Sequence, residues 1–304
     1  MKNFLSIIAL SLLLAMPSAS GAKKNQMKNP PRHVFFIGFD GMAARSIREG
    51  AVMPCFRKIM AEGSYTLHKR SVLPSSSALN WVSMYNGGAP EQHGYRKWDS
   101  RKAEFPAIYQ NEDGFFPDVF YLLKKKDPKA TTAHIYSWKG MRYVVDTLRV
   151  DYLQRNLLQN EADVVRMMDF ICEKKPTLTS IAFDEPDETG HAKGFGSDEY
   201  HQKITHVDSL LSIIVERIKK AGMWDNSIII LTSDHGGEFG TKHHGGITLD
   251  ELETAFVICG KGIKQGWEIP ECVMGYDLAG TMAYILGLDI PQPWIGKPIM
   301  SVFK

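Results

Sequence analysis

The sequence predicts an α/β fold in three layers, with a largely parallel sheet and helices on both of its faces. Five apolar runs of four to six residues lack the alternation of half-exposed strands, as expected for strands covered on both faces. Segments with helical periodicity lie between them, and this alternation favours a parallel sheet. The runs are residues 34–39, 133–136, 178–183, 228–232 and 255–259.

The clearest helix is expected to begin near Ser197, which is a suitable N-cap residue. Asp198 and Glu199 suit the positive end of a helix, and Gly222 follows its last turn. Apolar residues recur along it at three- and four-residue steps: Ile204, Val207, Leu211, Ile214 and Ile218. Helices are also predicted over 163–174 and 275–286. The polar segment 99–131 is expected to be a loop that passes over the core.

Composition sets limits on domain number and on the class of partner. The chain has 304 residues, of which 44% are hydrophobic, and this suffices for a sizeable core. Its net charge of +2 gives no strong field, and no nucleic-acid-binding surface is evident. We see no internal repeat or linker, so residues 23–304 are predicted to form a single domain. The sequence does not indicate an oligomeric state.

The N-terminus has the pattern of a secretory signal. Lys2 is followed by an apolar run over 4–15 and then by the small residues PSASGA. The run is too short to span a bilayer comfortably, and an uncleaved anchor is the less favoured alternative. We therefore assign residues 1–22 to a signal peptide, cleaved near Ala22. The mature chain is expected to have no transmembrane span and to be exported, either periplasmic or secreted.

The four cysteines are spread along the chain and form no C-x-x-C pair, so neither a thiolate zinc site nor a redox motif is visible. An exported protein could form disulfides, but their connectivity cannot be read from sequence. The pairing therefore stays open for Cys55, Cys172, Cys259 and Cys272.

Acidic and histidine side chains follow three of the apolar runs. Asp40 follows the first, and the stretch 184–191, with four carboxylates and a histidine, follows the third. Asp234 and His235 follow the fourth. Ligands of parallel sheets bind outside the carboxyl ends of the strands, so these side chains are expected to gather at one edge. Capping of the next helix would account for one such residue but hardly for all three sets.

This mixture of side chains favours zinc, which takes imidazole nitrogen and carboxylate oxygen. A magnesium site would use oxygen ligands and would rarely gather histidines. His243 and His244 lie a little beyond His235, each as a further candidate, with His244 preferred. Glycines beside the candidate ligands permit sharp turns and leave room for metal and substrate.

A nucleophile is expected in residues 73–84, where a Ser-rich turn leads into a predicted helix. A hydroxyl at a helix N-terminus meets a positive dipole and free N–H groups, which together bind phosphate. Taken alone, this segment is more simply interpreted as an N-cap, so its catalytic interpretation depends on the metal-binding pattern.

The order of these motifs resembles the alkaline phosphatase superfamily, and most of all its type I phosphodiesterase/nucleotide pyrophosphatase branch. The resemblance spans roughly residues 33–300 and includes the segments P-x-x-H-G at 90–94 and E-P-D at 185–187. The matching residues, in order, are Asp40, Ser77 with Asn80, Asp187 with Gly190 and His191, Asp234-His235-Gly236 and His244-Gly245. This resemblance implies an alkaline-phosphatase-like fold.

The resemblance also implies two Zn²⁺ ions, although other divalent metals are possible. One zinc would be held by Asp187, His191 and His244. The other would be held by Asp40, Asp234 and His235, with the Ser77 oxygen as a further ligand. Ser77 would then be the nucleophile of a phospho-enzyme mechanism, with Asn80 and the Ala78 N–H binding a non-bridging oxygen. Ser75 and Ser76 are the neighbouring alternatives to Ser77.

The function predicted from these residues is that of an exported zinc-dependent phosphoric ester hydrolase of the phosphodiesterase type, acting on a small-molecule phosphate ester. A phosphomonoesterase is the alternative, because it would share the metal core and would need a cation such as Arg96 or Lys97 for the extra charge. A non-catalytic exported binding protein ranks lower. A sulfatase is disfavoured because Cys55-Phe56-Arg57 lacks the C-x-P-x-R pattern. The leaving group and the natural substrate stay open.

Overall fold

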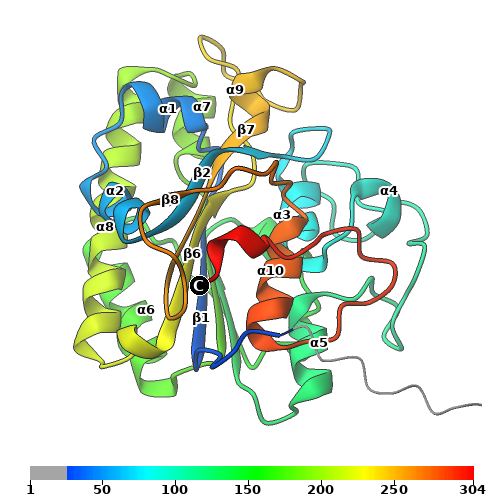
Figure 1. Ribbon diagram of the computed structural model, residues 1–304. Coiled ribbons are helices and arrows are strands. Elements are labelled where there is room, and N and C mark those ends of the chain that lie inside the picture. Colours follow the sequence, from blue (N-terminus) through cyan, green and yellow to red (C-terminus); the bar gives the residue numbers. More distant parts are fainter. Residues whose placement is uncertain (1–25) are drawn as a thin grey trace, which may run out of the picture.

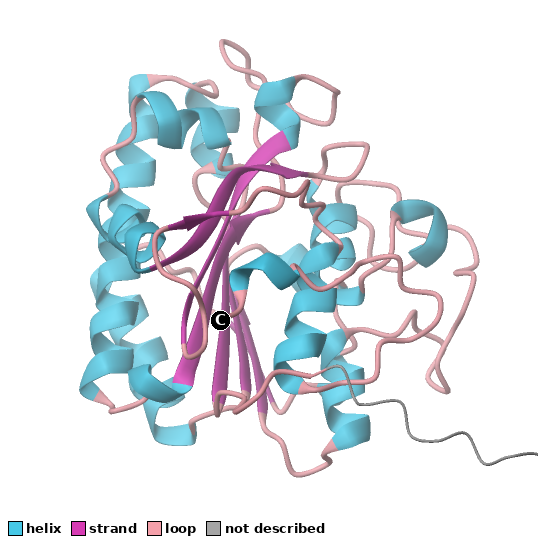
Figure 2. Ribbon diagram, in the orientation of Figure 1, coloured by secondary structure: helices cyan, strands magenta, loops and turns pink. Residues whose placement is uncertain are grey.

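The structure is a computed structural model that describes residues 26–304. A sheet forms its middle layer, between helices (Figure 2). It has eight strands in the order β4-β3-β5-β1-β6-β7-β2-β8. The strands are β1 (His33–Phe39), β2 (Gly63–Arg70), β3 (Thr132–Tyr136), β4 (Tyr152–Arg155), β5 (Leu178–Phe183), β6 (Ser227–Ser233), β7 (Glu253–Gly260) and β8 (Trp267–Glu268).

The five strands from β4 to β6 are parallel to their neighbours, and the apolar runs predicted four of them, all but β4. The remaining predicted strand, β7, is antiparallel to both β6 and β2, whereas β8 is parallel to β2, so the sheet is mixed but largely parallel, as predicted. β2 was not predicted because its sequence, GSYTLHKR, is polar and its partner β7 lies far along the chain.

Helices cover both faces of the sheet (Figure 1). On one face lie α1, α2, α6, α7 and α8, and on the other lie α3, α5 and α10. The helices are α1 (Ala44–Glu49), α2 (Pro54–Glu62), α3 (Ser77–Asn86), α4 (Pro90–His93), α5 (Val119–Lys126), α6 (Glu161–Lys174), α7 (Asp187–Lys193), α8 (Asp198–Lys220), α9 (Leu249–Leu252) and α10 (Asp277–Leu286).

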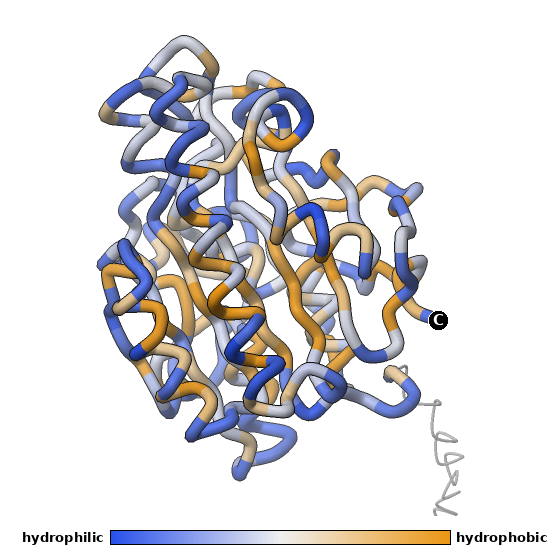
Figure 3. The backbone as a smooth tube through the Cα atoms, turned by 90° about the vertical axis from the view of Figure 1, so that its left-hand side faces the viewer, coloured by the Kyte–Doolittle hydropathy of each residue, from blue (hydrophilic) through white to orange (hydrophobic). Residues whose placement is uncertain are grey.

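Strand β1 shows how the sheet divides the interior into two cores. Phe35 and Ile37 belong to the core beneath α2, α6 and α8, whereas Val34 and Phe36 belong to the core beneath α3, α5 and α10. Alternate side chains of a strand point to opposite faces, so a strand covered on both faces is apolar throughout. Helix α8 packs its apolar residues into the core that contains Phe35 and Ile37. In Figure 3, hydrophobic and hydrophilic residues accordingly alternate along the turns of this helix.

The segment 99–131 differs in part from its prediction as a loop, because α5 lies within it. Asp118 caps this helix by accepting a hydrogen bond from the Tyr121 backbone N–H at 2.8 Å. The apolar residues of α5 then pack into the core beneath α3 and α10. By contrast, the helix predicted to begin near Ser197 is confirmed, with Ser197 as the N-cap of α8.

The predicted signal peptide, residues 1–22, lies outside the described residues. Within residues 26–304, no helix combines the length and apolar character needed to cross a bilayer. All four cysteines lie in this range and none is paired: Cys55, Cys172, Cys259 and Cys272.

Candidate metal centre

The carboxyl ends of β1, β5 and β6 bring the predicted ligands together. Asp40 follows β1, and Asp187 and His191 lie on α7, which follows β5. The close approach of these two segments requires a glycine at position 41, where φ is +69° and a Cβ atom would lie 2.9 Å from the Asp187 Cα.

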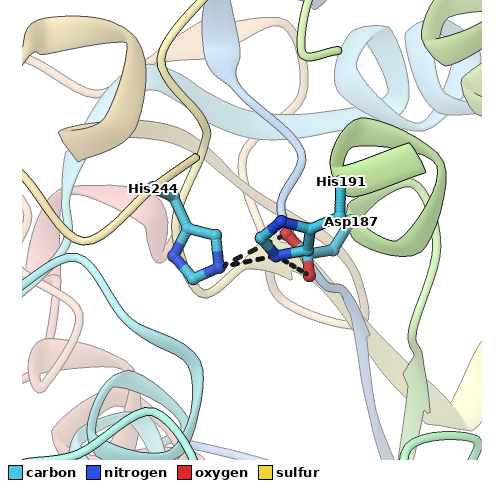
Figure 4. Close-up of side chains that lie close together, drawn as sticks. All are labelled: Asp187, His191 and His244. Atoms are coloured by element: carbon cyan, nitrogen blue, oxygen red, sulfur yellow. Dashed lines mark hydrogen bonds and ion pairs between the residues drawn. The ribbon is translucent and has the colours of Figure 1, made fainter. Parts of the chain in front are cut away.

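Two groups of three side chains could each hold a metal ion, with all ligand atoms of a group within 4.8 Å of one another. They match the two sets implied by the resemblance: Asp187, His191 and His244; and Asp40, Asp234 and His235. The rings of His235 and His244 stack with their centroids 3.9 Å apart, so the two groups adjoin. His244 rather than His243 belongs to the first group. Figure 4 shows this first group, drawn from α7 and from the loop after β6.

Backbone carbonyls orient all three histidines in the same way. The Nδ1 atoms of His191, His235 and His244 lie 2.8, 2.7 and 2.9 Å from the carbonyl oxygens of Lys242, Gly236 and Ser75. A carbonyl only accepts, so each Nδ1 carries the proton and each Nε2 is left with a free lone pair. When both rings are neutral, the Nε2 atoms of His191 and His244 face each other at 3.1 Å without a proton between them. A metal ion is the natural partner for two such nitrogens.

Asp40 and Asp234 each have one oxygen held by a hydrogen bond and one open oxygen. Trp81 Nε1 donates to Asp40 Oδ2 at 3.2 Å, and the Gly41 backbone N–H donates to Asp234 Oδ1 at 3.1 Å. The opposite oxygens, together with Asp187 Oδ1, are buried without a hydrogen-bond partner. A buried carboxylate oxygen without a partner is costly, so these three fit the oxygen ligands of a cation.

Burial and mutual repulsion shift the pKa values of the acids in this centre. Burial, with Asp234 and Asp187 nearby, raises the pKa of Asp40 well above its usual range. Burial, followed by the charge of Asp187, raises that of Asp234 to about 8. Burial lowers the pKa of His235 to about 3 and that of His244 to about 4. Asp40 and Asp234 are thus costly to ionise by themselves, and a divalent cation would remove that cost. The donor set fits zinc.

Ser77 is placed at this centre by the start of α3, where Ser76 is the N-cap residue. Its side chain is buried, and its Oγ lies 3.1 Å from His235 Nε2. Ser76 also lines the pocket, whereas Ser75 is turned away from it and is completely buried. Among the three serines, Ser77 is therefore the one whose hydroxyl meets a predicted metal ligand.

Ser75 holds the loop that carries His244. Its Oγ donates to the Gly246 carbonyl at 2.9 Å and accepts from the Gly245 N–H at 3.2 Å, while its carbonyl accepts from His244 Nδ1. Glu251 fixes the same loop by accepting from the Gly246 N–H at 2.6 Å. The sequence alone gave Ser75 only as an alternative nucleophile.

The structure gives Asn80 a different task from the expected one. Its Nδ2 donates to the carbonyls of Val72, Pro74 and Ser76, and its Oδ1 accepts from the Val72 N–H at 2.7 Å. The Ala78 N–H donates to the carbonyl of Trp98 at 3.0 Å. These donors are therefore used to hold the turn before α3 rather than to bind a non-bridging phosphate oxygen.

A pocket of about 780 Å³ opens above the centre. Beside the candidate metal ligands, it is lined by Trp98 and Trp138, whose rings stack 6.2 Å apart, and by several charged residues. The charged residues are Lys139, Arg155, Asp184 and Glu188. Arg96 and Lys97, the cations named from the sequence, do not line it. Trp81 lies in the core, and its indole N–H donates to Asp40.

A buried lysine lies next to the group formed by Asp40, Asp234 and His235. Lys69 of β2 is completely buried, and its Nζ donates to the Ser233 carbonyl at 2.7 Å. Burial lowers the pKa of Lys69 to about 7, against the opposing effect of Asp234. The contacted carbonyl belongs to the residue just before Asp234, so the Lys69 amine lies close to the acids of the centre. A lone lysine in a polar strand carries no sequence signal for this position.

The chain is similar to known proteins over most of its length. The family model for type I phosphodiesterase/nucleotide pyrophosphatase matches residues 34–256. The chain belongs to this family. Mouse ectonucleotide pyrophosphatase/phosphodiesterase family member 1 is 25% identical over 231 residues, covering 71% of this chain and 25% of the relative. Human bis(5'-adenosyl)-triphosphatase is 22% identical over 239 residues, covering 75% and 52%.

Among solved structures, human ectonucleotide pyrophosphatase/phosphodiesterase 5 aligns with a TM-score of 0.73 at 15% identity. The alignment covers 90% of this chain and 100% of that one. This likeness confirms the predicted alkaline-phosphatase-like fold. The chain spans only about a quarter to a half of the length of the two curated relatives.

Proposed function

We propose that the protein is an exported, zinc-dependent phosphodiesterase of the nucleotide pyrophosphatase type that acts through a covalent intermediate on Ser77. One observation carries the proposal: the Ser77 Oγ lies 3.1 Å from His235 Nε2, where two groups of open ligand atoms adjoin. The family of the chain and the size of the pocket support a small phosphate ester as substrate.

Two zinc ions would be held by the Asp187 group and the Asp40 group, and when bound they would lower the pKa of the Ser77 hydroxyl and stabilise charge on the phosphate oxygens. The chain orients the reaction through its own groups. Trp81 and the Gly41 N–H aim Asp40 and Asp234, and backbone carbonyls aim the histidines. The N-terminus of α3 adds a partial positive charge beside Ser77.

Deprotonated Ser77 Oγ attacks phosphorus, a new P–O bond forms, and the bond from phosphorus to the leaving oxygen breaks. The leaving group takes up a proton, and the retained half of the diester stays on Ser77. Water then attacks the same phosphorus, releases a phosphate monoester and returns the proton to Ser77. The two steps together consume one water molecule per diester.

An assay of the purified protein on aryl esters tests this function. We expect hydrolysis of an aryl phosphodiester to exceed that of the matching phosphomonoester and sulfate ester. Elemental analysis should find about two zinc ions per chain, in keeping with a two-metal site. Chelation should abolish turnover and added zinc should restore it. Full activity of metal-free protein would refute the zinc requirement, and a preference for the monoester would replace the diesterase by a phosphatase.

A further inference from the structure

The carboxyl edge of the parallel half-sheet is divided into two chemical halves. The candidate metal ligands follow β5, β1 and β6, whereas cations lie at or just beyond the ends of the next two strands, β3 and β4. Arg155 is the last residue of β4, and Lys139 begins the short 3-10 helix η1 (Lys139–Tyr143) after β3. Both cations line the same pocket as Asp40 and Ser77.

A backbone contact holds the Arg155 side chain in place and leaves its positive charge free to bind a ligand. Its Nε donates to the carbonyl of Ser137 at 2.9 Å, which ties the guanidinium to the end of β3. Over residues 26–304, neither Arg155 nor Lys139 forms an ion pair, and the two terminal nitrogens of Arg155 make no hydrogen bond. A tethered guanidinium with both terminal nitrogens free is well suited to a carboxylate or a phosphate.

Strand spacing sets how far this positive half lies from the reacting phosphorus. Neighbouring strands are about 4.8 Å apart, so β3 lies roughly 10 Å and β4 roughly 14 Å from β1. An anion bound between Lys139 and Arg155 therefore lies on the order of 10 Å from a phosphate at Ser77. Several bonds of spacer span this distance, whereas a phosphate joined directly to the scissile phosphate would not reach.

The acids of the pocket sharpen this division. Asp184 and Glu188 belong to the segment that follows β5, the strand between β1 and β3, and both line the pocket. Their negative charges would repel a second anionic group of the substrate if that group lay close to the scissile phosphate. A negative group at the far end meets the cations instead, so both repulsion and attraction favour the same length of substrate.

We propose that Lys139 and Arg155 form a subsite for a second negatively charged group on the substrate. This inference rests on the proposed diesterase function and deepens it. The substrate class is a phosphoric diester in which one ester group carries a carboxylate or phosphate about 10 Å from the scissile phosphorus.

A length series of synthetic diesters tests the subsite. The probes are p-nitrophenyl ω-carboxyalkyl phosphates with increasing numbers of methylene groups. Each is paired with the methyl ester of its carboxyl group, which keeps the phosphodiester charge and lacks the carboxylate charge. For the wild-type protein, the ratio of kcat/KM between acid and methyl ester should pass through a maximum on the order of tenfold, since each exposed charge contact contributes modestly. Raising the salt concentration should lower that maximum.

Two variants and a matched control locate the effect. Lys139→Gln and Arg155→Gln should each reduce the ratio, and the double variant should bring it close to one. Lys220→Gln removes one positive charge at the far end of α8 and outside the pocket, and should keep the wild-type ratio. A wild-type ratio near one at every length, or a ratio that survives in the double variant, overturns the proposal.

A binding experiment separates this inference from the proposed function. Zinc-loaded wild-type protein is titrated calorimetrically with ω-carboxyalkyl phosphonates and with their methyl esters, which contain no ester bond to phosphorus. Tighter binding of the acids, lost in the double variant, supports the subsite even if no diester is hydrolysed. Hydrolysis of the methyl ester series without any preference for the acids refutes the subsite while the diesterase stands.

Discussion

Replacing Ser75 by alanine tests whether the turn before α3 positions a metal ligand. The change removes the Oγ that bonds the Gly245 N–H and the Gly246 carbonyl, and it leaves both groups without that partner. A pair of such contacts is worth about 1–3 kcal/mol, and about 1.4 kcal/mol corresponds to a tenfold change in an equilibrium constant. If this energy orders the His244 loop, zinc should bind the Asp187 group roughly 5- to 140-fold more weakly.

The assay is a competition between the protein and a chromophoric chelator, read at both zinc sites, together with turnover at rising zinc concentration. Ser75→Ala should need more zinc to reach its maximum rate, and that maximum should approach the wild-type value. Ser76→Ala is the control for zinc affinity, because the Ser76 side chain makes no capping hydrogen bond at α3. Unchanged zinc affinity would refute the reasoning. Collapsed turnover with intact zinc affinity would instead make Ser75 the nucleophile.

Two further predictions address the turn before α3 and the N-terminus. Asn80→Ala should lower the free energy of unfolding by about 2–3 kcal/mol, because it deprives the buried Val72 N–H of its side-chain acceptor and removes one donor from each of three carbonyls; urea unfolding measures this, and unchanged stability with a slower rate would restore the phosphate-binding role. The mature protein should begin near Lys23 and fractionate outside the cytoplasm, and N-terminal sequencing that finds Met1 on a cytosolic protein would contradict export.

The sequence predicted the parallel half of the sheet and the ligands at its edge for one physical reason. Strands covered on both faces must be apolar, so β1, β5 and β6 stand out, and the polar residues after them have to meet at one edge. β2 gave no such signal, because it is polar and contains Lys69, whose burial depends on its position behind Asp234.

The tasks of single side chains in the turn before α3 were beyond the sequence. The spacing from Ser77 to Asn80 matches the family motif, yet the hydrogen bonds of Asn80 are decided by how residues 72–76 fold around it. Ser75 contacts a loop about 170 residues away, which no local pattern could reveal. The cations after β3 and β4 likewise became visible only through the strand order.

The covalent intermediate provides the most direct test of the central claim. Zinc-loaded protein is mixed with an aryl phosphodiester, quenched in acid within the first turnover, digested and examined by mass spectrometry. We expect the retained alkyl phosphate to be attached to Ser77. Ser77→Ala should show no adduct and keep both zinc ions, since six protein ligands remain, while turnover falls by about 10³-fold or more. An adduct on Ser75 or Ser76, or full turnover in Ser77→Ala, would contradict the account.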